Sequence, residues 1–193
     1  MLGLIRRTFT CLSKEVMLPL YTSLVRHFLE YGGVLWSATA SRAQIRAVEK
    51  IQIRAVSMVQ GLQDLDYEDQ LRSLKLTTLS ARRARGMMIE MWKHFHVYDK
   101  DTVGKSFRSG FSGRRNFECQ RLRSVGKHSK TFYAAAGVAW NKLPNDVRVS
   151  PNINTFKARL DKYWSNTPLK YNYLAIPPWT ITEEHGEIPL LDD

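Results

Sequence analysis

The chain has 193 residues, 44% of them hydrophobic and 11% aromatic, which is enough for one substantial core but not for two large domains. Its 29 lysines and arginines exceed its 18 acids and give a net charge of +11, a balance that favours polyanions such as nucleic acid or an acidic surface. Two cysteines exclude a disulfide framework. The sequence has neither a secretory signal nor a long apolar stretch, so we expect no membrane contact and an intracellular location, nuclear or cytoplasmic.

The first predicted helix covers residues 14–31 and ends at Gly32 and Gly33, with Pro19 marking its start or a kink. An apolar stripe at spacings of three and four is expected to be buried and consists of Val16, Leu20, Leu24, Phe28 and Tyr31. His27 and Glu30 lie one turn apart near the end of this helix. They are either a catalytic or metal-binding pair or an ordinary structural helix end. The lack of a third ligand nearby favours the structural interpretation.

The second predicted helix begins at Ser41, which has capping-box spacing to Gln44, and it reaches Gly61. Its apolar side is expected to be buried and consists of Ile45, Val48, Ile51, Ala55 and Val59. The opposite side carries basic residues at i, i+4 spacing, namely Arg42, Arg46, Lys50 and Arg54. We expect this basic side to contact nucleic acid, because lysine and arginine neutralise phosphates and release their counterions.

A short helix from about Asp66 to Leu74 precedes a long helix from about Thr78 to Tyr98. The long helix is expected to bury Leu79, Met88, Met91, Trp92 and Phe95. Its first turns carry Arg82, Arg83 and Arg85. Positive charge at this end opposes the helix dipole by up to about 1 kcal/mol per exposed group. We therefore expect these arginines to have a further use, and we assign them to nucleic-acid contact.

Residues 99–130 lose the helical period and are predicted to form a loop or a short β-hairpin. From Lys105 to Lys130 there are eight lysines and arginines against one acid, interleaved with three phenylalanines. Such a segment can contact phosphates and stack on unpaired bases, and the residues assigned to this role are Arg114, Arg115, Arg121 and Arg123. The alternative is a solvated loop whose phenylalanines anchor it to the core.

Two further helices are predicted in residues 131–164, at about 131–140 and 153–164. Residues 165–193 have one base against five acids, together with four prolines, and are expected to be extended and weakly structured. The fold class is therefore mainly α. We expect a compact bundle of about five to seven helices in residues 1–98 and 131–164, a basic loop or hairpin around 105–130, and an extended acidic tail.

A zinc site is the second metal possibility, since His94 and His96 could join Cys119 and His128. Side chains two positions apart in a helix point about 200° away from each other, so both histidines cannot bind one ion while they remain helical. No phosphate-binding glycine loop and no nucleophile–histidine–acid grouping is present. We expect no metal, no cofactor and no small-molecule substrate.

Several segments together resemble the region downstream of the reverse-transcriptase core in non-LTR (LINE-type) retrotransposon polyproteins. In order along the chain they are "LPLYTSLVRHFLEYGGVLW", "IRAVEKIQIRAV", "YEDQLRSLKLTTLSARRARGMMIEMWK", "TFYAAAGVAWNKLPNDV" and "NTFKARLDKYW". The chain departs from the usual family pattern at His27, where the family has proline, and at Phe28, where it has histidine. The resemblance covers Met1 to Trp164, and the combination is more specific than any one segment.

The resemblance implies a thumb-like region that grips template–primer nucleic acid, RNA or DNA, beside a polymerase core. In this family a catalytic aspartate and an F/Y-x-D-D turn hold the Mg²⁺ ions of nucleotidyl transfer. The nearest string here is "LLDD" at Leu190 to Asp193, which we interpret as accidental because no strand-forming residues follow it. We therefore expect no catalytic residues and no enzyme activity. The alternative is a helical protein-interaction module, or a translated remnant without a nucleic-acid role.

Overall fold

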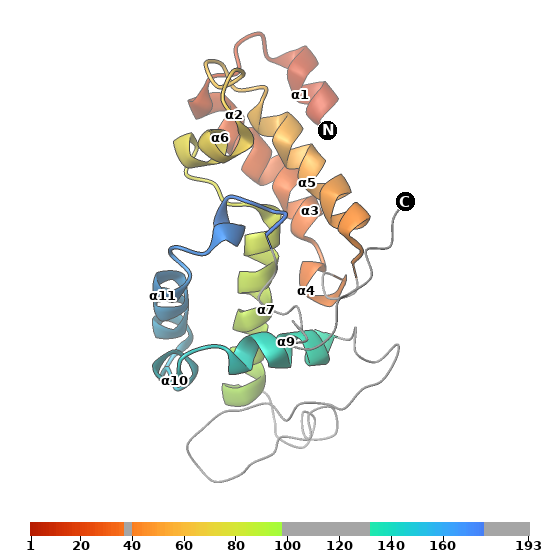
Figure 1. Ribbon diagram of the computed structural model, residues 1–193. Coiled ribbons are helices and arrows are strands. Elements are labelled where there is room, and N and C mark those ends of the chain that lie inside the picture. Colours follow the sequence, from red (N-terminus) through yellow and green to blue (C-terminus); the bar gives the residue numbers. More distant parts are fainter. Residues whose placement is uncertain (37–39, 98–131, 176–193) are drawn as a thin grey trace.

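Helix α7, Leu79–His96, runs down the middle of the molecule, and six other helical segments contact it: α3, α4, α5, α9, α11 and the short 3₁₀ helix η3 (Figure 1). The computed structural model describes residues 1–36, 40–97 and 132–175. These residues form helices and turns without a strand, which confirms the mainly α class. None of the described helices is long and apolar enough to cross a membrane.

The described helices are more numerous than expected, because several are only one or two turns long. They are α1 (Leu2–Thr8), α2 (Lys14–Tyr21), the π-helix η1 (Thr22–Arg26), α3 (His27–Glu30), α4 (Gly33–Trp36), α5 (Arg42–Val56), α6 (Tyr67–Ser73), α7, α9 (Phe132–Asn141), α10 (Asn145–Arg148), α11 (Ile153–Tyr163) and η3 (Pro168–Lys170). The predicted hairpin lies outside the described residues.

The helix predicted over residues 14–31 is present as α2, η1 and α3 in succession, with Pro19 inside α2. Proline has no N–H to donate to the preceding turn, and the wider π turn begins three residues after it. The carbonyl oxygen of Pro19 accepts hydrogen bonds from the hydroxyls of Thr22 and Ser23, at 3.1 and 2.7 Å. The chain therefore continues through Pro19 without a break.

The face of this helix that was predicted to be buried is half-buried at Val16 and Leu20 but exposed over its second half. Leu24, Phe28 and Tyr31 are 39, 65 and 85% exposed, whereas Met17, Tyr21 and Val25 are buried. Successive members of both sets are three or four residues apart, so periodicity alone cannot choose between them. The choice is made by the first hydrophobic cluster, whose buried members are Ile5, Leu12, Met17, Tyr21, Val25, Ala55, Val56, Val59, Leu71, Leu74 and Leu76.

Helix α5 begins as predicted with a capping box. The Gln44 N–H donates to Ser41 Oγ at 3.2 Å, and the Ser41 N–H donates to Gln44 Oε1 at 2.8 Å. Its buried face is only partly the predicted one. Ala55 and Val59 are buried, Ile45 and Val48 are half-buried, and Ile51 is 37% exposed. Polar residues on the same helix occupy the interior instead, and they form a network beneath its basic side.

Replacing Ser41 with alanine is expected to lower the free energy of unfolding by about 1 kcal/mol, because the side chain that satisfies a free N–H of the first turn is removed. Ser13→Ala is the matched control, since Ser13 is the N-cap of α2 but its side chain accepts no capping bond. Urea unfolding of both variants measures the difference. Equal decreases in the two variants would contradict the capping role.

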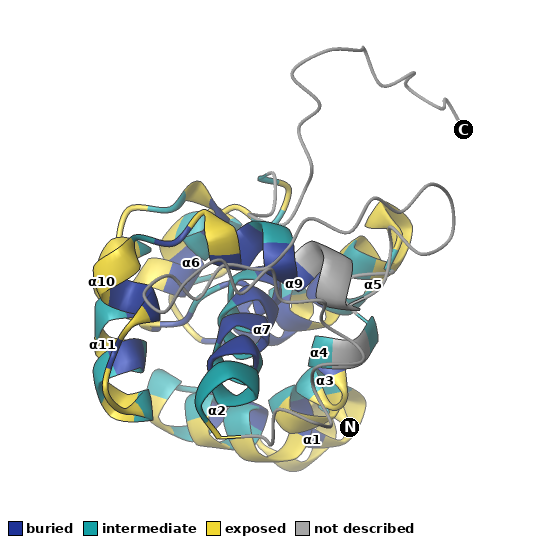
Figure 2. Cartoon of the chain, turned by 90° about the horizontal axis from the view of Figure 1, so that it is seen from below, coloured by how far each residue is buried: buried dark blue, intermediate teal, exposed yellow. Residues whose placement is uncertain are grey.

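A second hydrophobic cluster joins the C-terminal half of α7 to α9, α10 and α11. Its buried members are Met87, Met88, Met91, Trp92, Ala136, Ala139, Trp140, Leu143, Val147, Phe156 and Leu160. The Trp140 ring lies between Phe95 and Phe156, with ring centres 5.1 and 5.8 Å apart. Figure 2 shows the buried residues of α7 at the centre, surrounded by helices with exposed outer faces. Helix α7 thus belongs to the packing of both the N-terminal and C-terminal helices.

The first part of the predicted tail is folded rather than extended. Leu169 is 2% exposed, and its carbonyl oxygen accepts a hydrogen bond from Thr78 Oγ1 at 2.5 Å. The Thr78 N–H, which precedes α7, donates to the carbonyl oxygen of Lys170 at 3.0 Å. Tyr171 packs on the first cluster, with the Arg72 guanidinium 4.2 Å from its ring centre. Residues 165–175 therefore cap the start of α7, and residues 176–193 lie outside the described part.

Candidate nucleic-acid interface

The outer face of α5 carries the four basic residues that were predicted to lie together, and all four are exposed: Arg42, Arg46, Lys50 and Arg54. A helix rises 1.5 Å per residue, so they span about 18 Å along one side. Glu49 is the only acid in α5, and it is fully buried. The charged residues exposed on this helix are therefore all cationic.

These charges are not neutralised within the described residues, where none of the four side chains makes an ion pair or a hydrogen bond. Like charges at i, i+4 repel by about 0.2–0.5 kcal/mol per pair, and Arg42 also opposes the dipole at the start of α5. A bound polyanion would turn each of these unfavourable terms into a favourable one.

Arg6 of α1 extends the cationic face. A hollow of about 190 Å³ is lined by both Arg6 and Arg54, together with Ser57 and Met58. Helix α1 contains no acid. We call the set Arg6, Arg42, Arg46, Lys50 and Arg54 the basic surface. Arg6 was not among the predicted site residues, although an arginine pair in a helix without acids is a visible sequence signal.

Arg82 and Arg85, in contrast, form ion pairs with acids of this chain. Arg82 binds Glu30 of α3 through two nitrogens, with Nη2 3.2 Å from Oε2. Arg85 binds Asp161 of α11 through two hydrogen bonds of 2.7 and 2.9 Å. Pairing with these acids is a use for Arg82 and Arg85 that accounts for their unfavourable position at the start of α7. Each pair ties a separate helix to α7, and nucleic-acid contact by Arg82 or Arg85 stays a prediction.

Arg83 does not belong to an exposed interface, and its assignment to nucleic-acid contact is wrong for this fold. It is 4% exposed, it donates to Ser80 Oγ at 3.1 Å, and its guanidinium lies 5.0 Å from the ring centre of Trp36. Its side chain passes over Gly33, where an added Cβ would lie 3.3 Å from Arg83 Cγ. Glycine at position 33 therefore allows the close approach of α4 and α7.

A buried polar network lies beneath the basic surface and was not predicted. Glu49 Oε1 accepts hydrogen bonds from Tyr67 Oη at 2.6 Å and from the Leu79 N–H at 3.1 Å. Gln52, also fully buried, accepts from Tyr21 Oη at 2.6 Å and donates to Tyr67 Oη at 2.8 Å. The network connects α5 to α2, α6 and the start of α7, and it holds the helix that carries the basic surface.

Glu49 and Arg83 are opposite charges buried near each other without a direct bond. Burial raises the pKa of the Glu49 carboxyl, while its hydrogen bonds and the Arg83 charge oppose that rise. Burial lowers the pKa of Arg83, and Glu49 opposes that change. Glu49 Oε2 and Arg83 Nη1 are each buried without a hydrogen-bond partner among the described residues. Each charge is therefore partly compensated by the other, together with the hydrogen bonds of Glu49 and the charge of Glu30 near Arg83.

The histidines considered as catalytic residues or metal ligands make contacts with neighbouring side chains. Glu30 pairs with Arg82, and the exposed His27 ring lies 4.0 Å from that of Phe28. The structural interpretation of this helix end stays a prediction. The His96 ring is stacked on Trp92, with ring centres 4.4 Å apart. Burial lowers the pKa of His96, which favours the neutral ring. Among the described residues no group of three His, Cys, Asp or Glu side chains could hold a metal. Cys119 and His128 lie outside them.

The remaining predicted contacts, Arg114, Arg115, Arg121 and Arg123, also lie outside the described residues. The described part thus brings together four of the predicted arginines and lysines and adds Arg6, while Arg82 and Arg85 form ion pairs and Arg83 is buried. Comparisons of the chain with protein-family models, with curated proteins and with solved structures give no match.

Proposed function

We propose that this chain binds the sugar–phosphate backbone of template–primer nucleic acid, in the manner of the region downstream of a non-LTR retrotransposon reverse-transcriptase core. The observation that carries the proposal is the basic surface, whose five cations are exposed and unpaired among the described residues. The proposal assigns no nucleotidyl transfer to the chain, because its sequence lacks the F/Y-x-D-D turn.

The regular spacing supports nucleic acid over a folded acidic protein. Successive side chains on α5 advance about 6 Å along the helix axis. A duplex presents one negative charge about every 1.7 Å of its axis, so each cation can find a phosphate without a particular base sequence. Contacts of this kind position a protein on a duplex and do not read its bases. The proposed binding is therefore shape-directed and strongly salt-dependent.

A variant with Arg42, Arg46, Lys50 and Arg54 all changed to glutamine tests the proposal. The logarithm of the binding constant should fall less steeply with the logarithm of salt concentration, by about 0.9 for each phosphate that is no longer neutralised. Fluorescence anisotropy with a labelled RNA–DNA duplex, between about 50 and 200 mM salt, measures both slopes. We expect weaker binding at low salt and a shallower slope in the variant.

The matched control removes the same number of charges elsewhere, by changing Lys75, Lys142, Lys157 and Lys162 to glutamine. None of these lysines makes an ion pair among the described residues. The control should keep a slope close to that of the parent chain. If both variants show the same decrease in slope, only net charge matters and the assignment to α5 is wrong. Salt-insensitive binding by the parent chain would also contradict the proposal.

A second candidate function, protein contact, is favoured by one observation. Leu24, Phe28 and Tyr31 are 39, 65 and 85% exposed and repeat at helical spacing. Exposed apolar residues grouped on one face are a feature of protein-interaction sites. The two candidates make different predictions for the α5 variant, because a protein-interaction module would show no specific change in nucleic-acid binding when the four charges are removed.

A further inference from the structure

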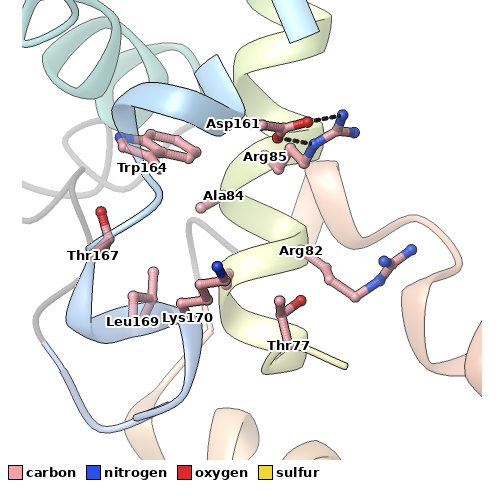
Figure 3. A pocket seen from close by; sticks show the side chains of 10 residues that line it. Thr77, Arg82, Ala84, Arg85, Asp161, Trp164, Thr167, Leu169 and Lys170 are labelled. Atoms are coloured by element: carbon pink, nitrogen blue, oxygen red, sulfur yellow. Dashed lines mark hydrogen bonds and ion pairs between the residues drawn. The ribbon is translucent and has the colours of Figure 1, made fainter. Parts of the chain in front are cut away.

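A cavity of about 400 Å³ lies between α7, α11 and η3 and shares no lining residue with the basic surface (Figure 3). This volume is within the range of small-molecule sites. Its apolar lining consists of Ala81, Ala84, Leu169 and Trp164, and its polar lining of Thr77, Thr167, Arg82, Arg85, Asp161 and Lys170. Figure 3 shows Trp164 and Lys170 on the same connecting segment, facing α7 across the cavity.

The charges in this cavity leave one cation available. Arg85 and Asp161 neutralise each other through their two hydrogen bonds, and Arg82 binds Glu30 outside the cavity. Lys170 makes no ion pair among the described residues. Its Nζ has one long hydrogen bond, 3.4 Å to the Ser165 carbonyl oxygen, and lies 5.3 Å from the ring centre of Tyr171. The Lys170 ammonium group therefore has N–H donors left for a ligand. The single net positive charge of the cavity matches one phosphate group better than a triphosphate.

Trp164 supplies a flat aromatic wall. It is only partly buried: one part packs against the second hydrophobic cluster and another part lines the cavity. Aromatic side chains stack on nucleobases of any sequence. Hydroxyls of Thr77 and Thr167 line the same space and can hydrogen-bond to a sugar or a base edge.

We propose that this cavity binds one nucleoside monophosphate unit, with its base against Trp164 and its phosphate at Lys170. The unit is either a free nucleotide or one unpaired nucleotide of a bound strand, and the second case rests on the function proposed above. In that case the basic surface holds the duplex while the cavity accepts a base that has left the stack. The ligand is a single nucleotide rather than a longer polyanion, because one ammonium and one indole define its ends.

The first experiment titrates the full chain with adenosine monophosphate and, separately, with inorganic phosphate, using calorimetry at low salt. Trp164→Leu and Lys170→Gln are each expected to weaken adenosine monophosphate binding by roughly tenfold, because each removes one of the two contacts. Trp164→Phe should keep most of the affinity, since it retains an aromatic wall. Lys162→Gln is the matched control, because Lys162 lies on the same helix as Asp161 but does not line the cavity.

The second experiment separates the two sources of the ligand. It compares a blunt duplex with the same duplex carrying one unpaired terminal nucleotide. If the ligand belongs to a strand, the unpaired nucleotide increases affinity by roughly tenfold in the parent chain, and Trp164→Leu abolishes that increase. If the ligand is a free nucleotide, adenosine monophosphate binds but the two duplexes bind equally.

The inference is overturned if phosphate alone binds as tightly as adenosine monophosphate, or if Trp164→Leu and Lys170→Gln bind it as well as Lys162→Gln does. Circular dichroism of each variant confirms that weaker binding does not come from unfolding, and Lys170→Gln still tests the site if Trp164→Leu unfolds. The four-site α5 variant should weaken both duplexes but leave adenosine monophosphate binding unchanged. Failure of the cavity and failure of the basic surface therefore give different results.

Discussion

Replacing Arg83 with methionine is expected to lower the free energy of unfolding by up to about 3–5 kcal/mol at neutral pH, because the buried Glu49 charge then keeps its hydrogen bonds but loses the nearby opposite charge. Glu49 is fully buried and Arg83 is 4% exposed, so water cannot replace the missing partner. Methionine keeps much of the length of the side chain across Gly33, and the decrease in stability therefore reports mainly on the charge. Urea unfolding of the full chain measures it.

The decrease should depend on pH in a defined direction. Burial raises the folded-state pKa of Glu49 above its ordinary value of 4.5, so the charged form carries a penalty above the folded-state pKa. That penalty fades as the pH falls through the folded-state pKa towards the unfolded value. Removing the Arg83 charge raises the folded-state pKa further. The difference between Arg83→Met and the parent chain is therefore expected to be smaller at pH 5 than at pH 8.

A double-mutant cycle isolates the pair. Glu49→Gln removes the negative charge and keeps an oxygen that can accept from Tyr67 and from the Leu79 N–H. The double variant Glu49→Gln/Arg83→Met has neither charge, and we expect its stability to decrease by less than the sum of the two single variants. Strict additivity, or a decrease in Arg83→Met that is equal at pH 5 and pH 8, would contradict electrostatic coupling between these residues.

Replacing Trp140 with alanine is the second change with a large expected effect, a decrease of about 3–5 kcal/mol in the free energy of unfolding. Trp140 is fully buried and lies in the middle of the second hydrophobic cluster, against Phe95 and Phe156. Its removal leaves a cavity where α7, α9 and α11 meet. The C-terminal helices should detach first, since the first cluster contains none of their residues.

Tyr31→Ala is the matched control for Trp140→Ala. Tyr31 is 85% exposed, so its replacement should change the free energy of unfolding by no more than about 0.5 kcal/mol. The same measurement tests which face of the first helix is buried, because a buried Tyr31 would cost several kcal/mol on truncation. A large decrease in Tyr31→Ala would show that this face is covered in solution.

The relation between the network and the basic surface explains why α5 can present four like charges. The helix buries Glu49 and Gln52 on its inner side, where Tyr21, Tyr67 and the Leu79 N–H form hydrogen bonds with them. These bonds fix α5 from beneath, and the capping box fixes its start. Contacts with α2, α6 and the start of α7 therefore stabilise α5 despite the repulsion between its outer cations. A bound polyanion would reduce that repulsion.

The features that sequence reasoning predicted correctly are local ones. Helix α5 begins at Ser41 because a capping box needs only residues three positions apart, and its basic residues share one exposed side because 3.6 residues complete a turn. The mainly α class follows from the same periodicity over most of the chain. These properties depend on neighbours in the sequence, and so they are readable without a tertiary structure.

The features that only the tertiary structure decided depend on residues far apart in the chain. The first helix has two apolar stripes, and contact with α5 and α6 selects Met17, Tyr21 and Val25. Arg85 meets Asp161 across 76 positions, and Thr78 meets Leu169 across 91, which turns a predicted extended tail into a cap on α7. A periodic pattern limits which side chains share a face, but it does not say which partner covers that face. Burial, charge pairing and cavities depend on that partner. The ion pairs of the α7 arginines and the cavity beside Trp164 are therefore visible only in the tertiary structure.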